Sequence, residues 1–260
     1  HISSGHSSGR GPKGTSDRPS QGRTKVIMLS PRKRTNFIIG FFVSLISIEK
    51  SHSYDGKLTA RPADEKPAQI QNVGIDENLG HKLDLNLLLK NEKDEDVKLG
   101  SFYDGVKPVV ISLVYFGCPG LCNFHLNGVI ETLKGVDWSA GDKFQVLAIS
   151  FDPREKSELA VSKKKSYLKL YDRAQADQGL HFLTADESAI KTITKQIGFR
   201  YYWNEKANEW AHASAAVVTT ADGTISRYIH GIMFDAKTFR FALAEATNGS
   251  IGTFVDQFIW

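Results

Sequence analysis

The sequence predicts an α/β fold in which a small central sheet is flanked by helices and preceded by an N-terminal β-hairpin. Two continuous apolar runs, residues 108–116 and 144–151, have the length and the branched side chains of buried strands. A helical pattern follows each run, and this alternation is typical of a sheet that helices cover on both faces. A second hairpin and a closing helix complete one domain.

The N-terminal hairpin is predicted from alternating apolar residues and a charged turn. Leucines at positions 83, 85, 87 and 89 alternate with other residues, which is the pattern of a half-buried strand. The charged residues 91–96 then lead to Val97-Lys98-Leu99, which we expect to be the returning strand. Residues 54–80, which include Pro62, Pro67 and Gly74, are expected to approach this hairpin as an extended segment.

The remaining elements follow from apolar periodicity and from turn residues. Asp186 is a candidate N-cap of a helix. The strands 214–220 and 224–229 flank Ala221-Asp222-Gly223, which is a strong hairpin signal. We expect a short strand at 181–183, a polar aromatic loop at 200–209, and helices over residues 121–134, 155–171, 186–197 and 235–246.

Residues 1–53 are predicted to be a leader that precedes the folded domain 54–260. Residues 1–36 carry a net charge of +7, which leaves −3 for the rest of a chain whose total is +4. The basic character therefore belongs to the leader, and the sequence indicates no nucleic-acid partner.

An apolar run of twelve residues, 37–48, follows Arg32-Lys33-Arg34 directly. A membrane-spanning helix needs about 20 residues, so the run is better suited to the core of an export signal, with Met28 as the start and small residues at 51–53 for cleavage. We expect an exported, periplasmic protein, and an uncleaved inner-membrane anchor formed by 37–48 is the alternative. Export would take the thiols into a compartment where disulfides form.

The two cysteines of the chain, Cys118 and Cys122, lie between a predicted buried strand and the helix that follows it. Amide groups and the helix dipole at such a position favour thiolate over thiol. Three uses remain open: a structural disulfide, a redox dithiol or a metal clamp. The disulfide would close a very small loop and remove little unfolded-chain entropy. Redox enzymes of this kind more usually have a C-x-x-C spacing.

A metal clamp needs a third ligand, and His212 is the best placed of the eight histidines. It directly precedes a predicted core strand, so it can reach the tip of a neighbouring strand, although a histidine there is often an ordinary surface residue. His125 lies on the predicted helix, His181 starts a strand as an expected structural residue, and His230 ends the hairpin. Two thiolates and one imidazole would favour copper(I), a soft ion.

The stretch 73–258 resembles the Sco/SenC family, whose members are thioredoxin-like proteins that deliver copper to the binuclear copper site of cytochrome c oxidase. The order and spacing of the matching motifs agree over most of the domain. These motifs are Val73-Gly74-Ile75-Asp76, Pro108-Val109-Val110, the segment 115–123, Leu126-Asn127-Gly128, Ser150-Phe151-Asp152-Pro153, His181-Phe182-Leu183-Thr184, Gly198-Phe199-Arg200-Tyr201, the segment around His212, and Asp222-Gly223.

The resemblance implies a thioredoxin-like fold and a copper site formed by Cys118, Cys122 and His212, able to hold Cu(I) and Cu(II). The spacing of the two cysteines across the strand-to-helix turn lets their Cα atoms approach closely enough for a disulfide, which we expect on oxidation. Asp152, which follows the second buried strand, is expected at most to support the ligands from outside the coordination sphere. The implied partner is the copper-bearing subunit of cytochrome c oxidase. A thiol reductant and another copper chaperone are further candidates.

On this resemblance we expect a copper chaperone and not an enzyme. The alternatives are a thiol–disulfide reductase that maintains the oxidase cysteines and a copper or redox sensor. Two features depart from the family pattern. Gly120 stands where many members have an acidic residue, and the Asp-Pro motif continues with Arg154-Glu155-Lys156-Ser157 instead of a further aspartate and threonine.

Overall fold

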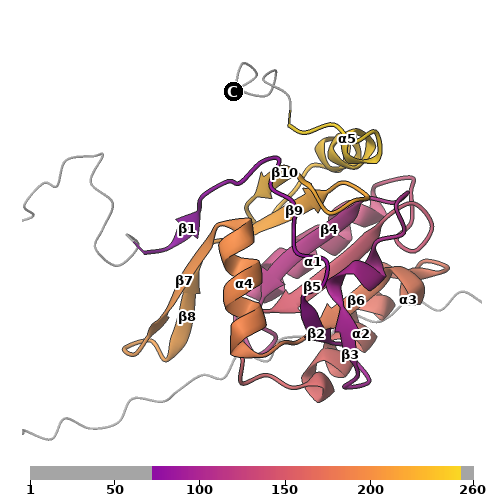
Figure 1. Ribbon diagram of the computed structural model, residues 1–260. Coiled ribbons are helices and arrows are strands. Elements are labelled where there is room, and N and C mark those ends of the chain that lie inside the picture. Colours follow the sequence, from indigo (N-terminus) through magenta and orange to yellow (C-terminus); the bar gives the residue numbers. More distant parts are fainter. Residues whose placement is uncertain (1–71, 253–260) are drawn as a thin grey trace, which may run out of the picture. The chain divides into compact units, whose positions relative to one another are not determined.

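The computed structural model describes residues 72–252, all of which belong to one compact unit. A five-stranded sheet forms its centre, with the strands in the order β10-β9-β4-β5-β6 (Figure 1). These strands are β4 Val109–Val114, β5 Gln145–Ser150, β6 Leu180–Leu183, β9 Ala215–Thr219 and β10 Ile225–His230. Strands β4, β5 and β6 are parallel, whereas β9 is antiparallel to both β4 and β10.

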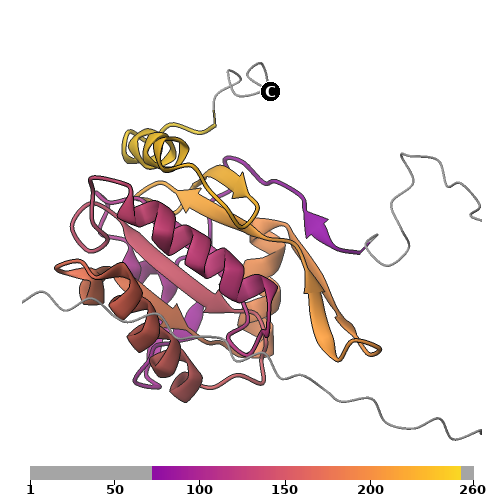
Figure 2. The ribbon, with the colours of Figure 1, turned by 180° about the vertical axis from the view of Figure 1, so that it is seen from behind.

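The centre of the sheet is buried on both faces, as its sequence predicts. Every residue of β4 and of β9 is buried, because continuous apolar runs can be covered on both sides. The helices that cover the sheet are α1 Leu121–Lys134, α2 Ser157–Tyr171, α3 Ala176–Gly179, α4 Glu187–Ile197 and α5 Ala236–Thr247. Helices α1 and α2 lie across one face (Figure 2), and α4 covers the other (Figure 1).

The two ends of α4 are fixed by Asp186, which the sequence identifies, and by Gly198. The side chain of Asp186 accepts a hydrogen bond of 2.7 Å from the N–H of Ala189, so the predicted N-cap is confirmed. Gly198 ends the helix with a φ of +73°, a left-handed conformation that suits glycine. The predicted hairpin of β9 and β10 is also confirmed.

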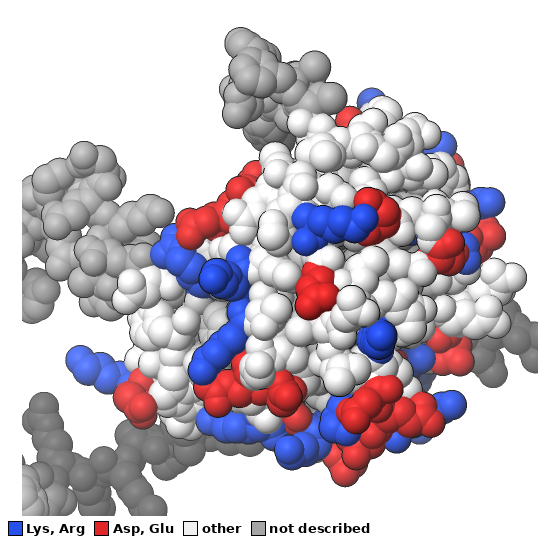
Figure 3. Space-filling model, in the orientation of Figure 1, with Lys and Arg blue, Asp and Glu red and all other residues white. Residues whose placement is uncertain are grey.

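The N-terminal hairpin is confirmed but is shorter than predicted. It consists of β2 Leu88–Lys90 and β3 Asp96–Lys98, and a 3-10 helix, η2 Leu99–Phe102, follows it. Residues 83–87 do not form a strand, because their backbone groups make hydrogen bonds to other segments. The N–H of Leu83 donates to the carbonyl of Gly223, and the carbonyl of Leu85 accepts from the N–H of Gly100. Figure 3 shows acidic and basic side chains interspersed over the face that carries this hairpin and α4.

The prediction of a loop at residues 200–209 is wrong. Strands β7 Phe199–Asn204 and β8 Glu209–His212 form an antiparallel hairpin there, and the short β1 Gly74–Ile75 pairs with β7. Cross-strand pairs such as Trp203 with Trp210 stabilise it, since large aromatic side chains favour a half-buried pleated surface. The start of α2 is also wrong by two residues, because residue 155 lies in the preceding turn.

Within residues 72–252, no helix has the length and apolar character needed to cross a membrane. The apolar run 37–48, the leader and the predicted domain boundary after residue 53 lie outside the described residues. Those expectations therefore stay predictions.

Gly128 of α1 is expected to resist replacement by alanine. A Cβ at this position would lie 1.9 Å from the backbone oxygen of Ile232, which cannot move as a side chain can. Alanine gains about 1 kcal/mol of helix propensity over glycine, but overpacking costs about 1–3 kcal/mol. We predict that Gly128→Ala lowers the free energy of unfolding in urea, whereas Asn127→Ala, at the exposed neighbouring position, raises it slightly. Stabilisation by Gly128→Ala would contradict the close approach.

Candidate metal centre

The two thiols lie where β4 passes into α1. The chain leaves the sheet after Val114 and turns through residues 115–120, and both sulfurs are buried, with Cys118 6% and Cys122 1% exposed. The N–H groups of Gly120 and Cys122 each point at the Cys118 sulfur at 3.4 Å. The N–H of Tyr115 points at the Cys122 sulfur at the same distance. Amide dipoles at a helix start therefore favour negative charge on these sulfurs.

His212, the last residue of β8, brings its imidazole to the thiols. Its Nε2 lies 3.2 Å from the Cys122 sulfur, and its Nδ1 lies 2.7 Å from the carbonyl oxygen of Ala213. Because a carbonyl oxygen can only accept, Nδ1 carries the proton and Nε2 turns a lone pair toward the sulfurs. Such a backbone contact is how proteins commonly orient a metal-binding histidine.

The structure thus brings Cys118, Cys122 and His212 together, with their ligand atoms all within 4.8 Å of one another. Aromatic rings enclose the imidazole, since those of Tyr115 and Phe151 lie 5.8 and 5.2 Å from it. A pocket of about 360 Å³ opens over Cys118 and His212, and its walls include the apolar side chains of Tyr115, Pro119, Leu121 and Trp210. Two of the three ligand residues, Cys118 and His212, therefore line a mostly apolar opening, whereas Cys122 lies behind it.

The two thiols have opposite acidities. The pKa of the Cys118 thiol is lowered, first by its hydrogen bond with Cys122 and also by the Cys122 amide, although burial opposes this shift. The pKa of the Cys122 thiol is raised, first by burial and then by Cys118. The pair therefore shares one proton, which Cys122 holds, with Cys118 as the thiolate.

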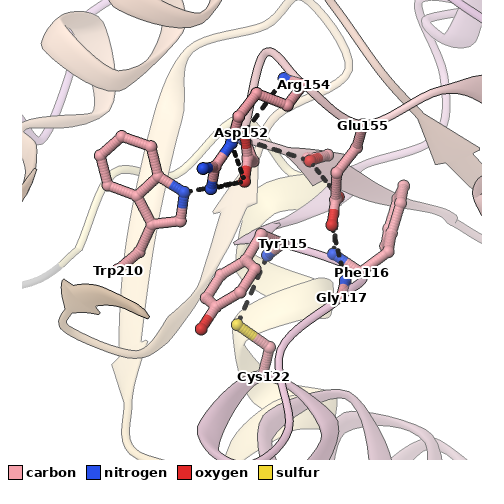
Figure 4. A network of polar contacts seen from close by, with 9 residues as sticks. Tyr115, Phe116, Gly117, Cys122, Asp152, Arg154, Glu155 and Trp210 are labelled. Atoms are coloured by element: carbon pink, nitrogen blue, oxygen red, sulfur yellow. Dashed lines mark hydrogen bonds and ion pairs between the residues drawn. The ribbon is translucent and has the colours of Figure 1, made fainter. Parts of the chain in front are cut away.

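Asp152 lies outside this cluster and supports it indirectly. Its carboxylate is held by Arg154, at 2.6 Å from Nη2, and by the indole Nε1 of Trp210 at 2.9 Å (Figure 4). Trp210 stands on β8 two residues before His212. Although burial opposes ionisation, the hydrogen bonds from Arg154 and Trp210 lower the pKa of Asp152. A permanent carboxylate thus fixes the strand that carries the imidazole.

Three further side chains that the sequence does not reveal hold residues 115–120, the turn that carries the first thiol (the thiol turn). The amide of Asn123 donates to the carbonyl of Cys118 at 2.8 Å, and Lys163 of α2 donates to the Asn123 oxygen at 2.7 Å. Glu155 accepts from the N–H groups of Phe116 and Gly117. No spacing rule indicates these roles, because the partners become neighbours only in the fold.

The other histidines in the described part of the chain do not join the site. His125 is buried, with Nε2 3.0 Å from the hydroxyl of Ser112 and Nδ1 3.2 Å from the carbonyl of Gly231. His181 contacts Gln145 at 3.1 Å, which agrees with its predicted structural role. His230 pairs with Glu77 at the surface.

The fold and the site together define a thioredoxin-like α/β protein with a buried dithiol and an imidazole. Residues 86–247 match the SCO1/SenC family, so the chain belongs to that family. The predicted fold class and the predicted family are therefore confirmed. A search of curated proteins found no match.

Solved structures show the same fold at low sequence identity. A candidate electron transfer protein from Aquifex aeolicus VF5 is 21% identical, with a TM-score of 0.59 over 66% of this chain and 96% of the other. ScoI of Arabidopsis thaliana with copper bound is 15% identical, with a TM-score of 0.50 over 63% and 96%. BsSco, a Sco-family cytochrome c oxidase assembly protein with a disulfide switch, is 16% identical, with a TM-score of 0.50 over 66% and 97%.

His125 is expected to make stability depend on pH. Burial lowers its pKa from 6.5 to about 4, so between these values the unfolded chain takes up a proton that the folded chain refuses. The free energy of unfolding should therefore fall as the pH drops below 6.5, by about 1.4 kcal/mol per unit for this group. Denaturation of wild type and His125→Gln from pH 7.5 to 4.5 should show a shallower decline in the variant. Equal slopes would contradict this assignment.

Proposed function

We propose that this chain is a copper-binding chaperone that delivers copper to the binuclear copper site of cytochrome c oxidase during its assembly. The observation that carries the proposal is the convergence of two cysteine sulfurs and one imidazole nitrogen within 4.8 Å. Soft thiolates select copper(I), zinc or iron–sulfur clusters, and imidazole suits copper as well. Membership of the SCO1/SenC family favours copper among these.

Relatives of the same fold support this choice. The Arabidopsis protein has been solved with copper bound, and BsSco belongs to a family of oxidase assembly proteins. The residues of this chain fit the ion, since Nε2 of His212 offers a free lone pair beside the Cys122 sulfur. Copper here is the cargo of the protein. Cys118 and Cys122 would supply two thiolates and His212 would complete a three-coordinate site for Cu(I) that also holds Cu(II).

The burial of the two sulfurs indicates an order of exchange. Cys118 borders the open pocket, whereas Cys122 is almost fully enclosed. Thiols of the copper-bearing oxidase subunit would therefore displace Cys118 first and Cys122 second, so that no free ion is released. The exposed apolar side chains of Leu121 and Phe124, 37% and 60% exposed on α1, lie at and near this opening, where they can contact a partner.

The same two cysteines would form a disulfide on oxidation, which removes both thiolate ligands. The protein then accepts copper only when reduced, and this requires a thiol reductant or another reduced copper chaperone as a partner. We infer a binding protein and not an enzyme. In the rival function, a thiol–disulfide reductase for the oxidase cysteines, Cys118 and Cys122 act without His212.

The apolar run 37–48 behind a basic segment supports export to the periplasm. An inner-membrane anchor formed by the same run would keep the copper site at the membrane surface. Either arrangement places the site on the side of the membrane where disulfides form.

Replacement of His212 tests the proposal. We predict that His212→Ala weakens Cu(I) binding by at least about 100-fold, because losing even a partner of a ligand costs about 10–100-fold in metal affinity. His230→Ala is the matched control, since His230 is exposed and contacts Glu77 and the ring of Tyr228 instead of the thiols. Competition with a chromophoric Cu(I) chelator measures both affinities.

Copper affinity and dithiol potential, measured together in His212→Ala, separate the chaperone from the reductase. A chaperone should lose most of its copper affinity, whereas the potential of the Cys118–Cys122 pair should change much less. Copper affinity that is the same in His212→Ala and wild type would exclude the proposed ligand set.

A further inference from the structure

Glu155 makes three hydrogen bonds to groups at the base of the thiol turn. One carboxylate oxygen accepts from the N–H of Gly117 at 2.6 Å. The other accepts from the N–H of Phe116 at 2.7 Å and from the hydroxyl of Ser150 at 2.6 Å. Figure 4 shows the side chain reaching from the turn after β5 toward the segment that enters the turn. One carboxylate thus joins the ends of two parallel strands.

These hydrogen bonds satisfy backbone groups that have left the sheet. Phe116 is 2% exposed and lies two residues beyond the end of β4, so its N–H has neither a strand partner nor ready access to water. A buried N–H without an acceptor is costly. Gly117 immediately precedes Cys118, so the carboxylate fixes the backbone one residue before the first thiol.

Glu155 has no competing role in α2. The helix begins at Ser157, and its N-cap position, Lys156, makes no side-chain cap hydrogen bond. The backbone N–H of Glu155 instead closes a turn onto the carbonyl of Asp152. In this turn the side chain projects toward the backbone of Phe116 and Gly117.

We propose that Glu155 is a positioning residue that holds the thiol turn, and thereby sets both the stability of the Cys118–Cys122 disulfide and the affinity of the dithiol for copper. The copper half rests on the function proposed above, whereas the disulfide half does not. Glu155 touches neither sulfur and acts through the backbone of Phe116 and Gly117.

Two effects of Glu155 act in the same direction on the redox equilibrium. A fixed turn keeps the two sulfurs near each other, so it raises their effective concentration and favours the disulfide. The negative charge disfavours a nearby thiolate, so it destabilises the reduced form. Loss of Glu155 should therefore make the disulfide easier to reduce.

The test compares Glu155→Ala with wild type in redox buffers of dithiothreitol or glutathione. The protein disulfide takes two electrons and two protons from the buffer thiols, which become the buffer disulfide, and mass spectrometry after thiol trapping gives the ratio. We expect the protein disulfide to be about tenfold less stable in the variant, a rise of about 30 mV in midpoint potential for a two-electron couple. Cu(I) affinity should fall about tenfold.

Glu158→Ala is the control, because Glu158 is exposed in the first turn of α2 and lies outside the network. Its potential and copper affinity should match wild type. Glu155→Gln keeps one oxygen acceptor but loses the charge and the second acceptor, so its disulfide should also be less stable than that of wild type, by about threefold. If Glu155→Ala does not fold, the midpoint potential of Glu155→Gln is compared with wild type instead.

A purely structural role predicts a different result. The melting temperature would fall in Glu155→Ala while the midpoint potential stayed at the wild-type value, and this result would overturn the proposal. A shifted potential in a protein whose wild type binds no copper would support the positioning role and refute the copper function alone.

Discussion

The contact between the Cys122 sulfur and the His212 imidazole joins segments that are 90 residues apart in the chain. One partner lies in the first turn of α1, and the other ends a strand of the β7–β8 hairpin. Neither segment holds the other by itself, because a single sulfur–nitrogen contact is weak. The surrounding structure therefore has to place both side chains independently, and most of the polar network near the thiols does this.

One turn, residues 152–155, holds both segments. Asp152 fixes β8 through Trp210, and the guanidinium of Arg154 stacks 4.5 Å from the ring of Trp203 on the other strand of the hairpin. Glu155 holds the start of the thiol turn. A carboxylate at each end of one short turn thus sets the position of the imidazole and of the thiols. Because the turn follows β5 directly, the rigid centre of the sheet carries the site.

The sequence predicts well what depends on local periodicity. The range of α1 is correct to the residue, and the central strands agree to within a residue or two. The two cysteines stand out by their spacing and by their place between strand and helix. The ligand role of His212 is implied by the family resemblance. The structure adds that its imidazole nitrogen and the two sulfurs lie within 4.8 Å of one another, as a shared metal ion requires.

What the sequence does not predict depends on contacts between distant residues. The β7–β8 hairpin resembles a polar loop because its strands are only half-buried, and its stability comes from cross-strand aromatic pairs. Glu155 fits the charged start of a helix as well as it fits an anchor for the thiol turn. Only the fold distinguishes these two roles, because the hydrogen-bond partners of Glu155 are backbone N–H groups 38 and 39 residues earlier in the chain.

X-ray absorption spectroscopy of the reduced protein loaded with one equivalent of Cu(I) tests the ligand set most directly. Two sulfur ligands and one nitrogen ligand in the first shell are expected, from Cys118, Cys122 and His212. A first shell without sulfur would contradict the thiolate site and would place copper elsewhere on the protein.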